Sequence, residues 1–219
     1  MDATEVVRRL REIDVSALCD ADKTLPVVDP GIRAMVPDVR FAGTAVTVLA
    51  ADDHLPVLSA LAAAAPGDVL VIATDGRALA VLGELFATEA HRRGLAGVVI
   101  DGRCRDLQGL RRVGLPVFAR GTVPMSGSTV SRAAVNGPVS CGGIEVQPGD
   151  VVFGDDDGLV IAPAQRILPA LETAGAIARS ERAILAAMER GEPLHDLTTY
   201  AEHVGALDAG LESRLAFRV

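Results

Sequence analysis

The sequence predicts a layered α/β sandwich in which a half with parallel strands joins a half with antiparallel strands. Asp68–Ala73 and Gly97–Asp101 are short apolar runs separated by a helical stretch, which is the pattern of a βαβ unit with buried parallel strands. From Val117 onward, short β-branched runs alternate with GG, PGD and GDDDG turn signals, which is typical of hairpins. The two patterns together favour an α/β fold with one parallel and one antiparallel half.

The first half of the chain alternates helices and strands. Residues 4–13 alternate apolar and charged side chains at helical spacing, and VSALCDAD extends the pattern as a second short helix. Prolines break TLPVVDPGIRAMVPDVRF, so extended or turn structure is expected there. The following elements are a strand, a helix ended by Pro66-Gly67, a strand, a helix and a strand, expected over Thr44–Ala50, Leu55–Ala64, Asp68–Ala73, Ala78–Arg93 and Gly97–Asp101.

The second half predicts hairpins followed by helices. Its short strand candidates are Val117–Ala119, Gly137–Val139, Ile144–Val146, Val151–Phe153 and Leu159–Ala162. A long amphipathic pattern then covers Arg166–Glu189, and Thr198–Leu215 is expected to be helical again. No internal repeat or linker divides the sequence. We therefore expect a single domain over residues 1–219, with a C-terminal helical extension over about 166–219.

Composition excludes several classes of protein. The 219 residues include 21 basic and 29 acidic side chains, a net charge of −8, and aromatic residues make up only 3%, so nucleic acid is not an expected ligand. The apolar runs are too short and interrupted for a membrane span, and the charged N-terminus lacks the features of a secretory signal, so a cytoplasmic protein is expected. Three widely spaced cysteines are read as reduced thiols. Lys23 is the only lysine, so neither a P-loop nor Schiff-base chemistry is favoured.

One acid and one Arg-Asp pair stand out as candidates for chemistry. Glu84 lies early in an expected helix, and twenty residues separate it from Arg105 and Asp106. That stretch is one helix plus one strand, so it can bring Glu84 back beside the pair at the carboxyl end of the parallel strands, where open α/β sheets bind ligands. A surface ion pair is the other reading of the same residues. Spacing alone leaves both open.

Longer strings in the chain resemble a known family. GELFATEAHRRGLAGVVIDGRCRDL, LPVFARGTVP and VNGPVSCGGIEVQPGDVVFGDDDGLVIAP are similar to the family that includes class II 4-hydroxy-4-methyl-2-oxoglutarate/4-carboxy-4-hydroxy-2-oxoadipate aldolases and the RraA-like regulators of ribonuclease E. The likeness begins near PGIRAMVPDVRFAGTAVTV and runs through Pro163. It implies an α/β/β sandwich that assembles as a homo-oligomer, a trimer or a hexamer, with active sites between subunits.

The resemblance also implies roles for the candidate residues. Asp106 would bind Mg²⁺ or Mn²⁺, a choice of ligand that suits hard cations. Arg105 would face the keto oxygen of a small 2-keto acid and stabilise the charge that develops there. Glu84 would contact the metal through a water molecule, and that water would act as the base on the substrate hydroxyl.

The family pattern extends to further positions and is not matched at all of them. The backbone N–H groups of Leu85 and Phe86 would hold the substrate carboxylate, and Glu181 of a neighbouring subunit would reach the metal through water. Two positions depart from the pattern. The aldolases have Asp where this chain has Glu84, and Gly109 stands where an acid is frequent.

Several other polar residues carry weaker signals. The run Asp155–Gly158 reads as a hairpin turn in preference to a cation site. His54 could contact a distal carboxylate or could be a solvated loop residue, and Asp101 could support the site or cap a turn. The remaining candidates are expected at the rim, in an unreactive position or on the surface: Arg103, Cys104, His91, His195 and His203.

Two functions follow. The first is a divalent-metal-dependent lyase that cleaves a 4-hydroxy-2-keto dicarboxylic acid to pyruvate by a retro-aldol reaction. The same chemistry would decarboxylate oxaloacetate, because both reactions leave the enolate of pyruvate. The alternative is a non-catalytic regulator that binds ribonuclease E or an associated protein.

Overall fold

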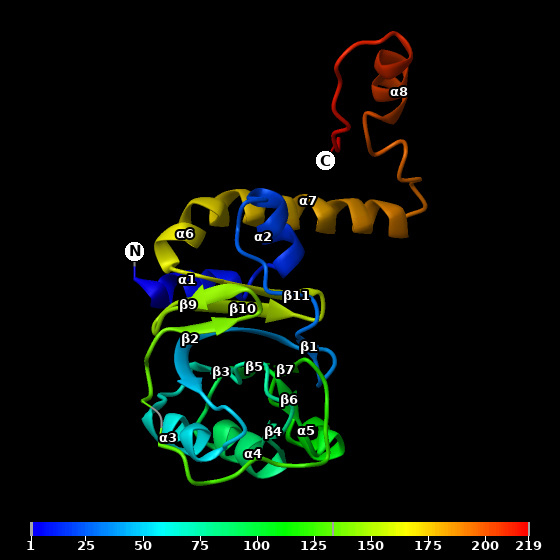
Figure 1. The fold of residues 1–219 in the computed structure, drawn as a ribbon. Coiled ribbons are helices and arrows are strands. Elements are labelled where there is room, and N and C mark those ends of the chain that lie inside the picture. Colours follow the sequence, from blue (N-terminus) through cyan, green and yellow to red (C-terminus); the bar gives the residue numbers. More distant parts are fainter. Residues whose placement is uncertain (1, 133, 219) are drawn as a thin grey trace.

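A seven-stranded mixed sheet organises the chain in the computed structural model, which describes residues 2–132 and 134–218 (Figure 1). The strand order is β1-β7-β5-β3-β2-β10-β11. Helices α3, α4 and α5 lie together on one side of this sheet, and α1, α2, α6 and α7 lie on the other (Figure 1). The predicted layered α/β architecture is confirmed.

Strand β2 (Arg40–Leu49) joins the two halves of the sheet. Its residues 40–44 pair antiparallel with β10 (Val151–Asp155), and its residues 45–49 pair parallel with β3 (Val69–Ala73). Side chains along β2 are largely buried, because helices or strands cover both of its faces. One strand therefore belongs to both the parallel and the antiparallel half.

The parallel half contains β2, β3, β5 (Gly97–Asp101) and β7 (Val117–Ala119). Between these strands the chain passes through α3 (Leu55–Ala63), α4 (Glu84–Arg92) and α5 (Leu107–Val113). The placement of Val117–Ala119 among the hairpins is wrong. Helix α5, which the sequence pattern did not indicate, returns the chain so that β7 pairs parallel with β5.

The antiparallel half is built on the hairpin of β10 and β11 (Gly158–Ala162), with a second hairpin of β8 (Val139–Cys141) and β9 (Ile144–Val146). Asp155 pairs with Gly158 across the tight turn, so the turn interpretation of the acidic run is confirmed. The Asp155 carboxylate accepts a hydrogen bond from Val15 N–H at 2.8 Å, which ties this hairpin to the first residue of α2. The acidic run therefore has a structural role in the turn and in the contact with α2.

A short segment nearly closes the sheet. Val27 forms a bridge with Val160 of β11, and β1 (Arg33–Ala34) pairs antiparallel with β7. Residues 27–34 therefore reach from one sheet edge to the other. The main core fills the space inside this sheet and beneath α3, α4 and α5, while a second core packs α1 (Ala3–Leu10), α2 (Val15–Ala21) and the helices after β11 against β10 and β11.

Several predicted elements differ in their bounds, and the strand predicted over Thr44–Ala50 is β2, which begins earlier, at Arg40, and ends at Leu49. The helix predicted over Ala78–Arg93 is wrong at its start, because Ala80–Leu82 forms strand β4 and pairs with β6 (Arg103–Cys104). Pro169 interrupts the long helical pattern, since it lacks the backbone N–H that a continuous helix needs. The pattern divides into α6 (Ala164–Ile167), a 3₁₀ turn (Leu168–Ala170) and α7 (Leu171–Glu189). The expected strand Gly137–Val139 begins only at Val139, and the tail is helical only over α8 (Tyr200–Asp208).

The C-terminal segment extends away from the body of the molecule beyond the end of α7 (Figure 1). None of the residues of α8 is buried. Where this segment leaves α7, Leu197 packs against Ile184 and Ala187 of that helix in a small separate cluster. Over the described parts of the chain, no helix combines the length and apolar character needed to span a bilayer.

Candidate functional site

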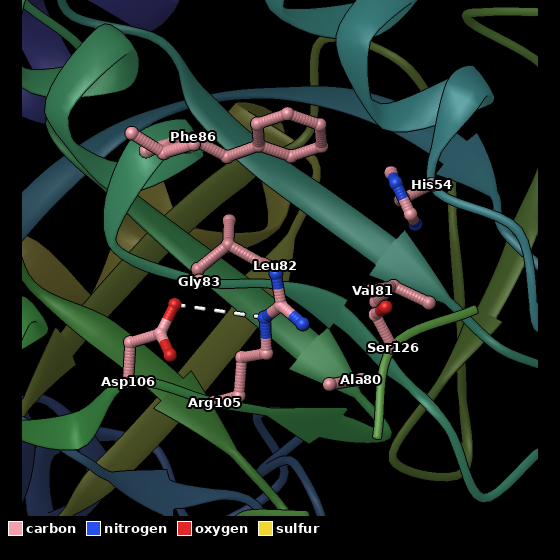
Figure 2. A pocket seen from close by; sticks show the side chains of 10 residues that line it. His54, Ala80, Val81, Leu82, Gly83, Phe86, Arg105, Asp106 and Ser126 are labelled. Carbon is pink, nitrogen blue, oxygen red and sulfur yellow. Dashed lines mark ion pairs between the residues drawn. The ribbon is translucent and has the colours of Figure 1, made fainter. Parts of the chain in front are cut away.

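A pocket of about 140 Å³ lies at the N-terminal end of α4 (Figure 2). Strand β4 and the two residues that follow β6 form one wall, and His54, the start of α4 and Ser126 form the others. The residues that line it are His54, Ala80, Val81, Leu82, Gly83, Leu85, Phe86, Arg105, Asp106 and Ser126. Five of the residues singled out from the sequence therefore meet at one pocket: His54, Leu85, Phe86, Arg105 and Asp106.

Arg105 and Asp106 follow directly after β6 and are held by the start of α4. Asp106 adopts the left-handed backbone conformation, with φ +59°, at the N-cap of α5. Its Oδ2 accepts a hydrogen bond from Glu84 N–H at 3.2 Å and lies 3.5 Å from Arg105 Nε. Figure 2 shows the Arg105 side chain extending into the pocket, facing His54 and Phe86. The predicted closeness of residue 84 to the Arg-Asp pair is confirmed.

Gly83 makes this arrangement possible. A Cβ at position 83 would lie 2.4 Å from Asp106 Oδ2 and 3.0 Å from Arg105 Cγ. Both distances are shorter than an unstrained contact, so any side chain at residue 83 would displace the pair. The chain therefore needs glycine where α4 begins.

The first turn of α4 offers hydrogen-bond donors to the pocket. An α-helix leaves its first N–H groups without carbonyl partners, so those of Glu84, Leu85 and Phe86 need acceptors elsewhere. Within the described part of the chain, Asp106 is the side chain that accepts from this turn, at Glu84. The N–H groups of Leu85 and Phe86, together with the Arg105 guanidinium, give the pocket a positive potential that suits an anion.

His54 forms the opposite wall. Its ring meets the Phe86 ring edge-on, with centroids 5.7 Å apart, and its Nδ1 is shielded from solvent and has no hydrogen-bond partner among the described residues. The two rings therefore close this side of the pocket. The structure thus places His54 at the site and not in a solvated loop.

The segment that carries Ser126 is anchored by a buried carboxylate. Asp53 is 1% exposed and accepts hydrogen bonds from Ser128 Oγ at 2.6 Å and from the N–H groups of Val130 and Ser131, both at 2.8 Å. Burial acts to raise the pKa of Asp53, but these hydrogen bonds outweigh it and hold that pKa well below its ordinary value. Ionised Asp53 therefore fixes the loop that borders the pocket.

The carboxylate of Glu84 points away from the pocket toward α5. Its Oε1 lies 3.0 Å from Arg112 Nη2, and its side chain lies directly over Gly109. Glu84 thus contacts Asp106 through its backbone and Arg112 through its side chain. It is not among the residues that line the pocket.

Glu181 is not brought to this pocket within one chain. It lies in α7, in the helical layer on the far side of the sheet from α4 (Figure 1). Burial and the neighbouring charges of Asp14 and Asp20 raise its pKa. Only a second subunit could bring Glu181 near Arg105.

The remaining candidates have other places in the structure. Asp101 accepts hydrogen bonds from Arg120 and from Gly142 N–H, so it joins β5 to the second hairpin and neither lines the pocket nor caps a turn. Arg103 is exposed and donates to the Arg120 carbonyl, as expected for a residue outside the pocket. Burial raises the pKa of Cys104 to about 11, so its thiol is unreactive. His91 and His195 are exposed as predicted, whereas His203 is half-buried.

The donors at the pocket fit a weakly held hard cation. Among the described residues there is no group of three or more His, Cys, Asp or Glu side chains placed to bind one metal ion. Asp106 supplies one carboxylate with a side chain 44% exposed. Mg²⁺ is commonly bound by one or two carboxylates and keeps its other positions for water and substrate, so the residues present fit this ion.

Three contributors to the site were not indicated by the sequence pattern. Gly83, Asp53 and Arg112 act through contacts between segments that are distant in the chain, and each belongs to a residue type that is common at turns or on surfaces. The only local signal was the GEL sequence at the start of α4, where glycine precedes the acid.

The fold and pocket define a mixed-sheet α/β protein in which the N-terminus of a helix lies beside an Arg-Asp pair. Residues 15–161 match the RraA-like family, described as Aldolase/RraA, and the chain belongs to that family. A protein of Halalkalibacterium halodurans named "Putative 4-hydroxy-4-methyl-2-oxoglutarate aldolase" is 34% identical over 161 residues, which cover 73% of this chain and 77% of that protein.

Two solved structures extend the comparison. An uncharacterized protein from Pseudomonas syringae pv. tomato superposes with a TM-score of 0.76 at 30% identity and covers 89% of this chain and 97% of its own. Streptomyces coelicolor RraAS2, described as an unusual member of the RNase ES inhibitor RraA protein family, has a TM-score of 0.70 at 30% identity. It covers 81% of this chain and 94% of its own. The similar proteins thus include one named as a putative aldolase and one described as a member of a ribonuclease-inhibitor family.

Proposed function

We propose that the chain is a divalent-metal-dependent lyase that cleaves a 4-hydroxy-2-keto dicarboxylic acid to pyruvate at the pocket beside α4. The observation that carries the proposal is the convergence of Arg105, Asp106 and the first-turn N–H groups of α4 on one pocket. The relatives named as aldolases support the same reaction class.

In the retro-aldol reaction, the bond between C3 and C4 of the substrate breaks. The hydroxyl on C4 loses its proton and becomes a carbonyl, and the electron pair of the broken bond forms the enolate of pyruvate, which then takes a proton at C3. Loss of CO₂ from oxaloacetate leaves the same enolate. We therefore expect oxaloacetate decarboxylation as a second activity.

Each residue has a task in this reaction. The N–H groups of Leu85 and Phe86 bind the carboxylate next to the keto group, and Arg105 donates to the keto oxygen as negative charge develops on it. The Glu84 carboxylate lies outside the pocket lining, so it acts through a water molecule that takes the hydroxyl proton and later returns a proton to C3. His54 faces the other end of the substrate from across the pocket.

Asp106 would hold Mg²⁺ or Mn²⁺, with Glu84 and the partner subunit's Glu181 reaching it through water. When bound, such an ion supplies Lewis acidity that stabilises charge on oxygen. Asp106 is placed for this by Gly83 and by the N–H of Glu84.

The test is pyruvate release, followed by coupled lactate dehydrogenase, from 4-hydroxy-4-methyl-2-oxoglutarate, 4-carboxy-4-hydroxy-2-oxoadipate and oxaloacetate. Each substrate is run with Mg²⁺, Mn²⁺ or EDTA, with a blank lacking protein. We expect turnover that requires metal and falls roughly 10²- to 10³-fold in Arg105→Ala. Metal-dependent turnover that is unchanged in Arg105→Ala would place the chemistry elsewhere, and no pyruvate from any substrate would contradict the lyase.

A second candidate function is regulation of a ribonuclease by direct binding. A hollow of about 600 Å³ at the β10–β11 turn is bordered by the acidic residues Asp14, Asp38, Asp156 and Asp157, by the buried Asp155 and by one basic residue, Arg40. The excess of acidic side chains suits a basic protein surface. The similarity to RraAS2 supports this alternative. Ribonuclease binding that is lost in Asp156→Lys and kept in Arg105→Ala would favour it.

A further inference from the structure

Glu84 and Gly109 are the two positions at which the chain departs from the family pattern, and the structure joins them in one contact. Helix α4 carries Glu84 in its first turn, and α5 carries Gly109 in its first turn. A Cβ at position 109 would lie 2.4 Å from the carboxyl carbon of Glu84 and 2.7 Å from its Cβ. The two helices therefore approach so closely at this point that only glycine fits at residue 109.

Close approach of the helices brings a cation to Glu84. Arg112 lies one turn further along α5, and its Nη2 is 3.0 Å from Glu84 Oε1. The two side chains are 65% and 40% exposed, so the ion pair by itself adds little to the free energy of unfolding. The ion pair instead fixes where the Glu84 carboxylate lies relative to the pocket.

A second contact joins the starts of α4 and α5, and here the side chain comes from α5. Asp106, at the N-cap of α5, reaches back over Gly83 and accepts from Glu84 N–H. Gly83 thus makes room for the Asp106 carboxylate, which lines the pocket, and Gly109 makes room for the Glu84 carboxylate, which lies outside it. Displacement of α5 would move both acids together.

We propose that Arg112 is a positioning residue that holds the Glu84 carboxylate just outside the pocket lining, in the space that Gly109 leaves open. This inference rests on the lyase function proposed above. Arg112 does not touch the substrate. It acts by restricting the longer Glu84 side chain, which would otherwise sample several rotamers and hold its water less well.

The first test is a double-mutant cycle on kcat/KM for pyruvate release. Arg112→Ala is expected to lower kcat/KM about 10- to 100-fold, the usual loss when the partner of an active-site group is removed. Arg112→Lys should recover part of this loss, and Arg111→Ala on the same helix should have no effect. In a Glu84→Ala background, Arg112→Ala should cause no further loss, because both changes act through one carboxylate.

The second test needs no turnover. The ¹⁵N resonance of the Arg112 guanidinium should shift in Glu84→Gln, while that of Arg111 should not. A shift together with the non-additive cycle is the result expected. Absence of the shift would overturn the inference whatever the activity.

Additive losses in the cycle, or full activity in Arg112→Ala beside an inactive Arg105→Ala, would overturn the positioning role while leaving the lyase intact. An inactive wild-type protein would instead overturn the lyase, and the positioning role with it.

Discussion

At position 83, a side chain would occupy space that the Asp106 carboxylate already fills. The spacing of Glu84 from the Arg-Asp pair predicted that these residues would meet, because one helix and one strand must return the chain to the same sheet edge. The same spacing could not predict that Gly83 admits Asp106 or that Arg112 reaches Glu84, since both contacts depend on how closely α4 and α5 pack. It also placed the Glu84 carboxylate in the site, whereas it lies outside the pocket lining.

Gly83→Ala tests the geometry of the site at this scale. The added methyl group would meet Asp106 Oδ2 at 2.4 Å, so the pair must move by about an ångström. A misplacement of that size can cost about 10²-fold in rate. We expect kcat/KM for pyruvate release to fall by that order while circular dichroism stays unchanged. Gly205→Ala, where a Cβ meets nothing within 4 Å, is the control.

Among the elements, strand β2 joins the two halves of the sheet, and the loop that carries Ser126 borders the pocket. Local sequence predicted most strands well, because each is a short apolar run between turn residues. It failed at Ala80–Leu82, because three apolar residues before a helix fit the helical period as well as a buried strand. This strand forms by pairing with β6, which is distant in the sequence. Local sequence also misassigned Val117–Ala119, because pairing direction is set by α5 and not by the strand itself.

Asp53→Asn should loosen the loop that carries Ser126. The loop donates at Ser128, Val130 and Ser131 to one carboxylate oxygen of Asp53, and the other oxygen accepts from Leu55 N–H at 2.9 Å. An amide has a single acceptor oxygen and no charge, so it cannot keep both sets of hydrogen bonds. Amide hydrogen exchange at Val130 and Ser131 is expected to become faster, whereas Asp20→Asn, a change in an exposed ion pair, should leave it unaltered. Unchanged exchange in Asp53→Asn would show that the loop is held by other contacts.

The same carboxylate predicts a pH dependence. Since the folded-state pKa of Asp53 is depressed, its stabilising contribution is fully present above the ordinary value of 3.8 and is lost progressively as the pH falls below it. Loop protection in the wild type should therefore decline below that pH, and the decline should be absent in Asp53→Asn. An equal decline in both proteins would assign the effect to another group.

Gly43→Ala tests the strand that joins the two halves of the sheet. A Cβ there would lie 2.2 Å from the Gly67 carbonyl oxygen and 2.9 Å from Val69 Cγ2. Overpacking of this kind lowers the free energy of unfolding by about 1–3 kcal/mol. Gly137→Ala, which meets open space, should be neutral in the same urea titration. Equal midpoints for the two variants would contradict the close approach at β2.

At the scale of the whole molecule, the C-terminal segment stands out because many of its apolar side chains stay exposed in a single subunit. Exposed apolar side chains gather on the last turns of α7 and in this segment, at Leu185, Met188, Leu194, Tyr200, Val204, Leu207, Leu211, Leu215 and Phe217. Exposed apolar patches are typical of association surfaces, in line with the homo-oligomer that the family resemblance leads us to expect. The helical tail was predicted in part, but its separation from the body was not, because local periodicity carries no information on what a helix packs against.

Sedimentation velocity tests that assembly. The full chain is expected to sediment as a species larger than its 22.7 kDa subunit, and deletion of residues 193–219 should shift the distribution toward smaller species. Within the deleted segment Leu197 packs against Ile184 and Ala187 of α7, whereas α8 buries none of its residues, so the circular dichroism of the remaining chain should change little. An unchanged distribution after deletion would exclude the tail from the interface.

The central claim is that the pocket beside α4 stabilises the enolate of pyruvate, and the most direct measurement follows that step alone. In D₂O with Mg²⁺ or Mn²⁺, NMR would record exchange of the methyl protons of pyruvate for deuterium, which requires enolate formation but does not depend on the identity of the natural substrate. We expect metal-dependent exchange in the wild type that is lost in Arg105→Ala and retained in Gly205→Ala. Exchange no faster than in the blank without protein, or equal in wild type and Arg105→Ala, would contradict the account.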